Sequence, residues 1–231
     1  MFWGEWEPES EVTSITNPIP GGPEFIHTPY YVRPTDYSGD FQNTDPFVFG
    51  DQFLYTLCRQ LKPIHGQWRP TFLRDLAPGS LILFGSLKGG GFVLDTVFVV
   101  ANGILHNASS WQTNLSGLVS DTYSDVTMCT TYQTAWTQDL RLYLGATPDE
   151  QSGEIFSFAP CLPSEIAPSG FARPTIVVEG MTTPGLMMGV KVTRNLSLDH
   201  ISTVWNDIVT QVLTQGLALG TRFDMPVRRD Q

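Results

Sequence analysis

The fold is decided by residues 76–100, which read LAPGSLILFGSLKGGGFVLDTVFVV. Two apolar runs, Ser80–Phe84 and Phe92–Val100, are rich in the β-branched and aromatic residues that favour strands, and a glycine-rich segment separates them. Pro78-Gly79 supplies a turn before the first run. The stretch therefore predicts a β-hairpin with residues 85–91 as its loop.

Asp95 interrupts the second predicted strand. Side chains alternate along a strand, so one face would carry Val93, Asp95, Val97 and Val99, and the other Phe92, Leu94, Thr96, Phe98 and Val100. A carboxylate among valines needs a partner, because burying an unpaired charge costs several kcal/mol. The first interpretation is a structural Asp that accepts backbone N–H groups or pairs with an Arg. The second is a carboxylate in a pocket lined by the sheet.

The composition describes a globular protein with many turns. Of its 231 residues, 41% are hydrophobic and 16% charged, and the chain contains 17 Pro and 21 Gly. Such a chain is long enough to bury a substantial core, and frequent turns favour strands over a helical bundle. We predict one α+β, β-rich domain over residues 1–231, with a small mixed or antiparallel sheet or a partly open barrel.

The formal charge of −10 counts against an extended basic nucleic-acid surface, since Lys and Arg supply the phosphate contacts of such a surface. A pocket for a nucleotide, or for a single extruded base of nucleic acid, remains compatible with this charge. Three widely spaced Cys residues indicate neither a disulfide framework nor a zinc site. We expect no metal and no cofactor.

The chain begins MFWGEWE, without a basic, apolar leader. Its apolar runs are all shorter than the roughly 20 residues that cross a bilayer. We therefore expect a cytoplasmic protein that has no membrane partner. The sequence leaves the oligomeric state open.

Residues 1–46 place prolines and glycines too closely for a helix or a long strand. We predict an ordered coil that wraps the core, because its aromatic side chains need a surface to cover. Long ordered coil often forms the wall of a binding site. The aromatic residues concerned are Trp3, Trp6, Phe25, Tyr30, Tyr31, Tyr37 and Phe41.

Several further elements are predicted from local patterns. Residues 51–60 are ambiguous between strand and helix, and the alternation of Phe53, Tyr55 and Leu57 favours a strand. Residues 111–120 are polar and predict an exposed loop. Short strands are expected at 104–106, 126–132, 140–144, 153–158, 175–178 and 186–192.

Ser197 begins the one segment with a clear helical pattern. Apolar residues from Ile201 to Leu213 follow i, i+3, i+4 spacing, Ser197 suits the N-cap, and Gly216 can end the helix. We predict an amphipathic helix that packs on the sheet, with Trp205 in the core.

Short strands, the run Gly79-Ser-Leu-Ile-Leu-Phe and the following strand at 93–100 together resemble the small PUA-like barrels, which include the ASCH and EVE domains. The resemblance covers about a quarter of the chain. It implies recognition of a modified base or nucleotide in an aromatic-walled cleft. No catalytic motif of that superfamily can be carried over, and the N-terminal coil departs from its pattern.

The densest group of candidate site residues is Trp3-Gly4-Glu5-Trp6-Glu7. In an extended chain Glu5 and Glu7 would share one side, about 7 Å apart, which suits an acid and a base on either side of a glycosidic bond. Trp3 and Trp6 would stack on a base. The alternative is an acidic, exposed N-terminus.

Three further sets of residues complete the predicted site. Asp51, next to Gly50, is the next candidate catalytic carboxylate, or else a turn or helix cap. Tyr30 and Tyr31 are candidate substrate-binding rings. Arg173 lies in an apolar, proline-bound stretch, where it would pair with a buried carboxylate or bind a phosphate.

The leading hypothesis is a hydrolase of the DNA-glycosylase kind, which acts on a nucleotide or modified nucleobase and cleaves its N-glycosidic bond. The second is a non-catalytic PUA-like module that binds a modified base or small nucleotide. The third is a structural or partner-binding protein, in which the aromatic coil packs inward.

Overall fold

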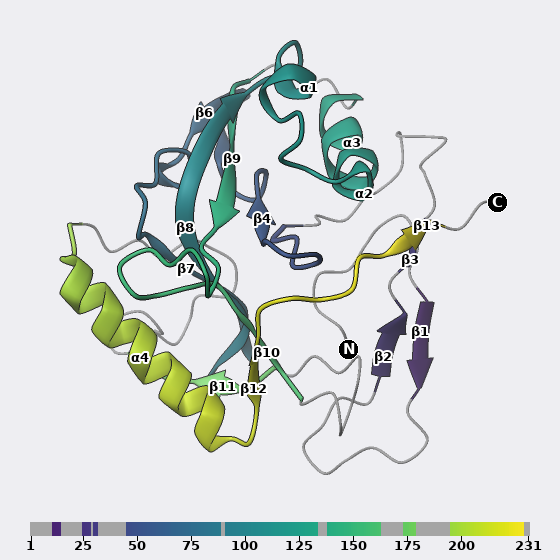
Figure 1. Ribbon diagram of the computed structural model, residues 1–231. Helices are drawn as coiled ribbons and strands as arrows, with labels where there is room; N and C mark the ends of the chain where they lie inside the picture. Colours follow the sequence, from purple (N-terminus) through teal and green to yellow (C-terminus); the bar gives the residue numbers. More distant parts are fainter. Residues whose placement is uncertain are drawn as a thin grey trace.

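The computed structural model describes residues 11–14, 25–28, 30–31, 45–88, 91–133, 138–162, 173–178 and 195–228. These residues form a strand-rich α+β fold, with an antiparallel main sheet that does not close into a barrel across the described residues and one C-terminal helix beside it (Figure 1). The predicted fold class is confirmed.

The elements follow one another along the chain as Figure 1 labels them. The first strands are β1 (Glu11–Ser14), β2 (Phe25–Thr28), β3 (Tyr30–Tyr31), β4 (Leu54–Tyr55), β5 (Leu61–Ile64) and β6 (Gln67–Pro70). The middle of the chain contains η1 (Phe72–Arg74), β7 (Leu81–Lys88), β8 (Gly91–His106), α1 (Trp111–Asn114), α2 (Asp121–Tyr123), η2 (Ser124–Cys129) and α3 (Thr130–Gln133). The last elements are β9 (Leu140–Gly145), β10 (Ala159–Cys161), β11 (Thr175–Ile176), α4 (Leu198–Thr214), β12 (Ala218–Gly220) and β13 (Val227–Arg228).

Strand β8 is the centre of the main sheet. Its first half pairs with β7 and with β11, and its second half pairs with β9, which pairs in turn with β4. The predicted hairpin is confirmed, but its strands are longer than expected, because Lys88 pairs with Gly91. Residues 104–106, expected as a separate strand, are the end of β8.

Two β-bulges bend β8. Phe84 pairs with Thr96 and Gly85 with Leu94, so Asp95 is an extra residue without a partner on β7. Ala101 is skipped in the same way opposite β9. A bulge reverses the side-chain alternation, so the predicted faces are wrong at this point and Leu94 shares a face with Val97.

The two faces of the bent sheet are covered by different parts of the chain. Helix α4 packs on one face (Figure 1), where Trp205, Ile208 and Val212 are buried against Leu94 and Val97. The other face carries the second core, whose members include Phe47, Tyr55, Phe98, Val100 and Leu142. Strand β8 therefore contributes side chains to both cores.

Helix α4 has the features that the sequence predicts. The Ser197 hydroxyl accepts from the His200 N–H at the N-cap, and the helix ends before Gly216, whose φ is 77°. Trp205 is buried, and its Nε1–H donates to the Phe156 carbonyl oxygen at 2.9 Å. The predicted core position of Trp205 is confirmed.

Residues 121–133 form helical turns in place of the strand predicted at 126–132. Val126, Thr127 and Met128 are buried there, and Tyr123 packs edge-on against Phe47 at 5.0 Å. Burial on a helical face outweighs the β propensity of VTMCTTY. Residues 111–120, predicted as a loop, begin with the short helix α1, and Leu115 is buried.

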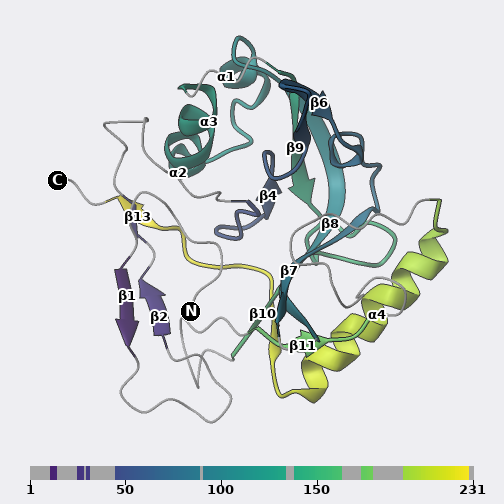
Figure 2. The same ribbon diagram turned by 180° about the vertical axis from the view of Figure 1, so that it is seen from behind.

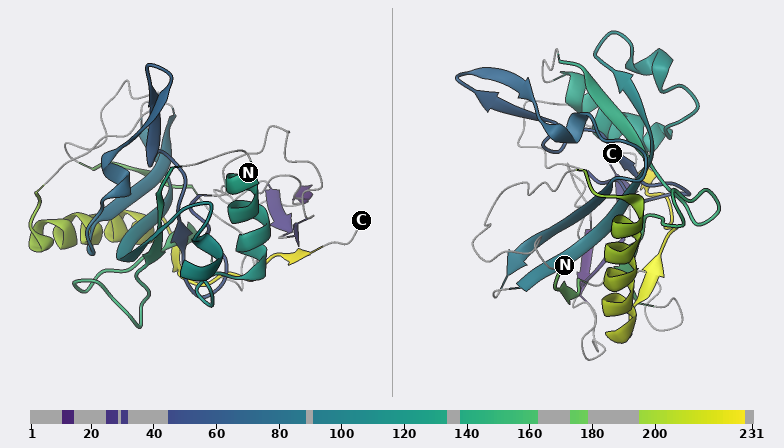
Figure 3. Two further views of the ribbon diagram at one scale, coloured as in Figure 1. Left: turned by 90° about the horizontal axis from the view of Figure 1, so that it is seen from above. Right: turned by 90° about the vertical axis from the view of Figure 1, so that its left-hand side faces the viewer.

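Strands β5 and β6 form a two-stranded ribbon that projects from the body of the protein, away from α4 (Figure 3). Its turn uses positive φ angles at His65 (50°) and Gly66 (76°), the geometry of a type I′ hairpin. The strand favoured at 51–60 is reduced to β4, which spans Leu54–Tyr55. The β-bridge between Ser152 and Ile155 replaces most of the strand predicted at 153–158.

Three short strands lie within the N-terminal range that was predicted as coil. Strands β1 and β2 pair antiparallel (Figure 2), and β3 pairs parallel with β13 (Figure 1). The coil prediction is wrong for these residues, and the rest of 1–44 lies outside the described residues. The strand predicted at 175–178 is confirmed at β11, and the one predicted at 186–192 also lies outside the described residues.

Candidate functional site

The bulge in β8 brings the carboxyl group of Asp95 to a position that regular alternation would not give it. Gly85 lies opposite the bulge, and a Cβ atom at this position would come within 2.3 Å of the Val93 carbonyl oxygen. Only glycine permits this approach of the two strands. The Phe84-Gly85 sequence therefore determines where Asp95 lies.

Arg173 meets Asp95 from the segment just before the neighbouring strand β11. The Leu94 N–H donates to the Pro174 carbonyl oxygen at 2.9 Å, and Thr175 pairs with Val93, so Arg173 lies across from the bulge. Its Nε–H donates to Oδ1 of Asp95. The structure thus confirms the pairing of Arg173 with a buried carboxylate.

The two partners differ in their access to solvent. The Asp95 side chain is 0% exposed, whereas the Arg173 side chain is 28% exposed. Nη2 of Arg173 donates to Oγ of Ser86 at 3.2 Å, and Ser86 is exposed. The guanidinium group therefore connects a buried carboxyl to the surface.

Burial gives the Asp95 carboxyl an unusual proton affinity. Desolvation raises its pKa from 3.8 to about 7, and the charge and hydrogen bond of Arg173 oppose this rise without cancelling it. Oδ2 of Asp95 and Oγ1 of Thr96 are buried and have no hydrogen-bond partner among the described residues. A carboxyl with this pKa can give or take a proton near neutrality.

A second polar cluster surrounds His106 at the far end of β8. Its Nε2 lies 2.8 Å from Oγ1 of Thr56 and its Nδ1 lies 2.6 Å from the Tyr132 hydroxyl. Burial lowers the His106 pKa from 6.5 to about 4, so the ring is neutral at physiological pH. Both ring nitrogens have a hydrogen-bond partner, so His106 links β8 to Thr56, just after β4, and to α3. Its role in this arrangement is structural.

Asp45 is the third buried titratable group. Its carboxylate accepts the backbone N–H groups of Thr56, Leu57 and Cys58, and this closes the loop around β4. Burial raises its pKa to about 6, although the three N–H groups lower it. Because its oxygens are used by the backbone, Asp45 is a structural carboxylate in this arrangement.

The candidate residues chosen from the sequence have different outcomes. Glu5, Glu7, Trp3 and Trp6 lie outside the described residues, and Tyr30 and Tyr31 form β3, where the structure describes the backbone alone. Asp51 is 76% exposed in its side chain and forms an ion pair with Arg222 at 2.7 Å. These assignments stay predictions. For Arg173, another of the predicted site residues, the structure shows a carboxylate partner, Asp95.

Sequence reasoning placed Asp95 on the sheet but preferred Glu5, Glu7 and Asp51 as the catalytic carboxylates. The missed signal was Gly85, because an isolated glycine inside a strand often marks a bulge. The His106 cluster had no local signal. Its hydrogen bonds join residues 50 and 26 positions apart.

No protein-family model, curated protein or solved structure matches this chain. The resemblance to PUA-like domains therefore stays a prediction. In the part of the chain that the structure describes, no group of three or more His, Cys, Asp or Glu side chains is arranged to hold a metal ion. None of the described helices is long and apolar enough to cross a membrane.

Proposed function

We propose that this protein is a cytoplasmic enzyme that acts on a nucleotide or modified nucleobase and hydrolyses its N-glycosidic bond, with Asp95 as the acid. One observation carries the proposal. A fully buried carboxyl, placed by a β-bulge and titrating near neutrality, lies beside an arginine that reaches the surface. Perturbed carboxyl groups of this kind are characteristic of acid–base sites.

The raised pKa of Asp95 lets its carboxyl hold the proton that this reaction needs. When the bond between the sugar carbon and the base nitrogen breaks, the protonated carboxyl gives its proton to the leaving base. A water molecule adds its oxygen to the sugar carbon and loses a proton to a second carboxylate. Glu5 and Glu7 are the candidates for this second group, since aromatic residues surround them in the sequence.

Arg173 supports both the acid and the substrate. After Asp95 loses its proton, the adjacent guanidinium stabilises the carboxylate that remains. A guanidinium group has five N–H donors; in Arg173, Nε donates to Asp95 and Nη2 donates to Ser86. Its exposed donors suit a phosphate oxygen of a nucleotide.

The experiment is a screen for base release. Purified protein is incubated with nucleosides, nucleotides and oligonucleotides that contain normal or modified bases, and free base is measured by mass spectrometry. We expect release from at least one class of substrate, and a loss of about 100-fold or more in Asp95→Asn. Glu5→Gln, Glu7→Gln and Asp51→Asn test the other candidate carboxylates.

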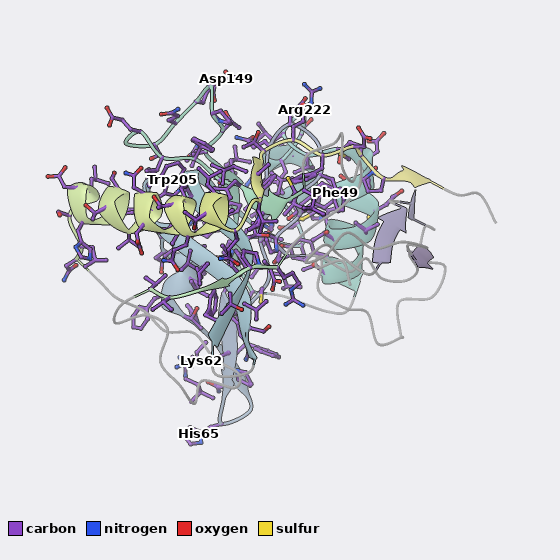
Figure 4. All side chains as sticks on the ribbon, turned by 90° about the horizontal axis from the view of Figure 1, so that it is seen from below. Phe49, Lys62, His65, Asp149, Trp205 and Arg222 are labelled. Atoms are coloured by element: carbon purple, nitrogen blue, oxygen red, sulfur yellow. The ribbon has the colours of Figure 1, made fainter. Side chains whose placement is uncertain are left out.

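A matched control is Asp149→Asn, which removes an exposed carboxylate outside the proposed site and should leave activity unchanged (Figure 4). If no substrate releases a base, the proposal is wrong. If all the carboxylate variants are as active as the wild type, the assignment of Asp95 is wrong.

A non-catalytic reader of a modified base is the second candidate. It is favoured by the hydrogen bond between Arg173 and Asp95, because the buried carboxyl holds a part-exposed guanidinium whose donors can meet a base edge without any turnover. Such a binding module would bind its ligand and release no product. Its affinity would depend on Trp3, Trp6 and Tyr30, and Asp95→Asn would bind nearly as well as the wild type.

A further inference from the structure

The β5–β6 ribbon concentrates positive charge in an acidic protein. Residues 52–74 contain four of the 13 Lys and Arg residues and none of the 23 Asp and Glu residues. Residues 62–70 are exposed throughout. Figure 4 shows Lys62 and His65 at the lower end of that view, away from Trp205, Asp149 and Arg222.

Two cations lie directly opposite each other on the ribbon. Lys62 pairs with Arg69 in the β5–β6 register, and neither has an acidic partner among the described residues. Like charges at directly opposed positions of a strand pair are destabilising. A bound anion would relieve this repulsion, so the ribbon is electrostatically complementary to a polyanion.

The opposite face of the ribbon carries an aromatic ring. Trp68 pairs with Pro63 there and is 45% exposed. Phe72, just after the ribbon, is 56% exposed. A single strand that crosses the edge of the ribbon would meet the cations on one face with its phosphates and the exposed ring on the other face with an unpaired base.

The ribbon is held firmly at its base. Gln60 donates from Nε2 to the Arg141 carbonyl oxygen at 2.6 Å and accepts the Arg141 N–H at 2.9 Å, which ties β5 to β9. Thr71, just after β6, donates its N–H to the Gln60 carbonyl oxygen at 2.8 Å and so closes the same end of the ribbon. Pro63 and Pro70 remove N–H donors from the two strands, which disfavours docking by addition of another strand.

We infer that the β5–β6 ribbon binds single-stranded nucleic acid, with Lys62 and Arg69 on its phosphates and Trp68 against a base. This inference rests on the proposed function for the purpose of the binding. It narrows the proposed substrate to a base within a single strand of nucleic acid. The small size of the ribbon agrees with the net charge of −10, which opposes a long duplex interface.

The test is fluorescence anisotropy of labelled single-stranded DNA and RNA across a series of salt concentrations. Lys62→Ala/Arg69→Ala should bind about tenfold more weakly or worse. The slope of log affinity against log salt should become shallower by about 1.4, because two phosphate contacts are lost and each contributes about 0.7. Trp68→Ala should lose about 5- to 150-fold.

Two controls isolate the ribbon. The charge-preserving variant Lys62→Arg/Arg69→Lys should retain the salt slope, and Arg222→Ala, which removes an exposed cation outside the ribbon, should bind like the wild type. Thermal unfolding of each variant verifies the fold. Equal affinity for a duplex, preferential binding of an acidic polypeptide, or an unchanged slope in Lys62→Ala/Arg69→Ala would overturn the inference.

Binding and base release are measured separately, so the two proposals can fail separately. Ribbon-dependent binding without base release would support the inference and contradict the enzyme. Base release from free nucleotides, with no binding of oligonucleotides by the wild type, would support the enzyme and contradict the inference.

Discussion

Arg173 donates a hydrogen bond to Asp95 across 78 residues of sequence, and this pair joins the bulge of β8 to the strand at the edge of the sheet. The carboxyl is closed to solvent while the guanidinium is part-exposed. The same contact therefore supports the fold and contains the carboxyl that we propose as the acid. Stability and activity measurements on Asp95 variants can separate these two roles.

Asp95→Ala should lower the free energy of unfolding by about 1 to 3 kcal/mol, because Arg173 loses its acceptor and the bulge loses a cross-strand contact. Asp95→Asn keeps the shape and one acceptor oxygen, so it should remain close to the wild type. Urea unfolding at neutral pH measures both. Equal losses in the two variants would show that charge, and not the hydrogen-bonded shape, maintains the site.

The pH dependence of stability should carry the signature of Asp95. Burial raises the pKa of Asp95 in the folded protein from the ordinary 3.8 to about 7, so the folded state binds the proton more tightly. The stability from this group is present below pH 3.8 and is lost as the pH rises to about 7. The wild type should therefore gain stability relative to Asp95→Asn on acidification from pH 7 to pH 4, by up to about 1.4 kcal/mol per pH unit. A constant difference across this range would show that the Asp95 pKa is not raised.

The central hairpin and the C-terminal helix were predictable because their signals are local. Alternating apolar residues mark β7 and β8, and Ser197 with the apolar stripe of α4 marks a capped helix. The pairing of Asp95 with an arginine was also predictable from the sequence, since a carboxylate among valines requires a partner. The hairpin and the helix together fix one layer of the fold.

Other features depend on contacts that a single sequence does not reveal. The bulge at Asp95 changes the side-chain alternation by one residue, which a strict period of two cannot represent. Val126 and Met128 are helical because they pack into the core beside Phe47. The net charge of −10 also concealed the local positive charge of residues 52–74.

Two glycine variants test the geometry of the bulge. Gly85→Ala would place a Cβ atom 2.3 Å from the Val93 carbonyl oxygen, so the strands must shift, and we expect a cost of about 1 to 3 kcal/mol together with a change in the Asp95 titration. Gly66→Ala is the matched control, because its φ is 76° and no atom lies within 4 Å of the new Cβ. It should cost about 1 kcal/mol and leave Asp95 unaffected. Chemical unfolding over pH 4 to 8 compares them. An unaltered Asp95 titration in Gly85→Ala would disprove the role of the bulge.

His106 should make the fold sensitive to acid. Burial lowers the pKa of His106 in the folded protein from the ordinary 6.5 to about 4, so its contribution to stability is lost as the pH falls from 6.5 to about 4. His106→Phe leaves the Thr56 and Tyr132 hydroxyls without the ring nitrogens, and should be less stable by about 1 to 3 kcal/mol at pH 7. The difference from the wild type should narrow toward pH 4. A difference that widens on acidification would contradict the neutral, buried histidine.

The most direct test of the central claim is the pH profile of base release by the wild type and by Asp95→Asn. If Asp95 is the acid, wild-type activity falls as the pH rises above about 7, because the carboxyl loses its proton. The folded Asp95→Asn protein should be about 100-fold less active or worse, and should lack this dependence. A folded Asp95→Asn protein that releases base at the wild-type rate, with the same pH profile, would contradict the account.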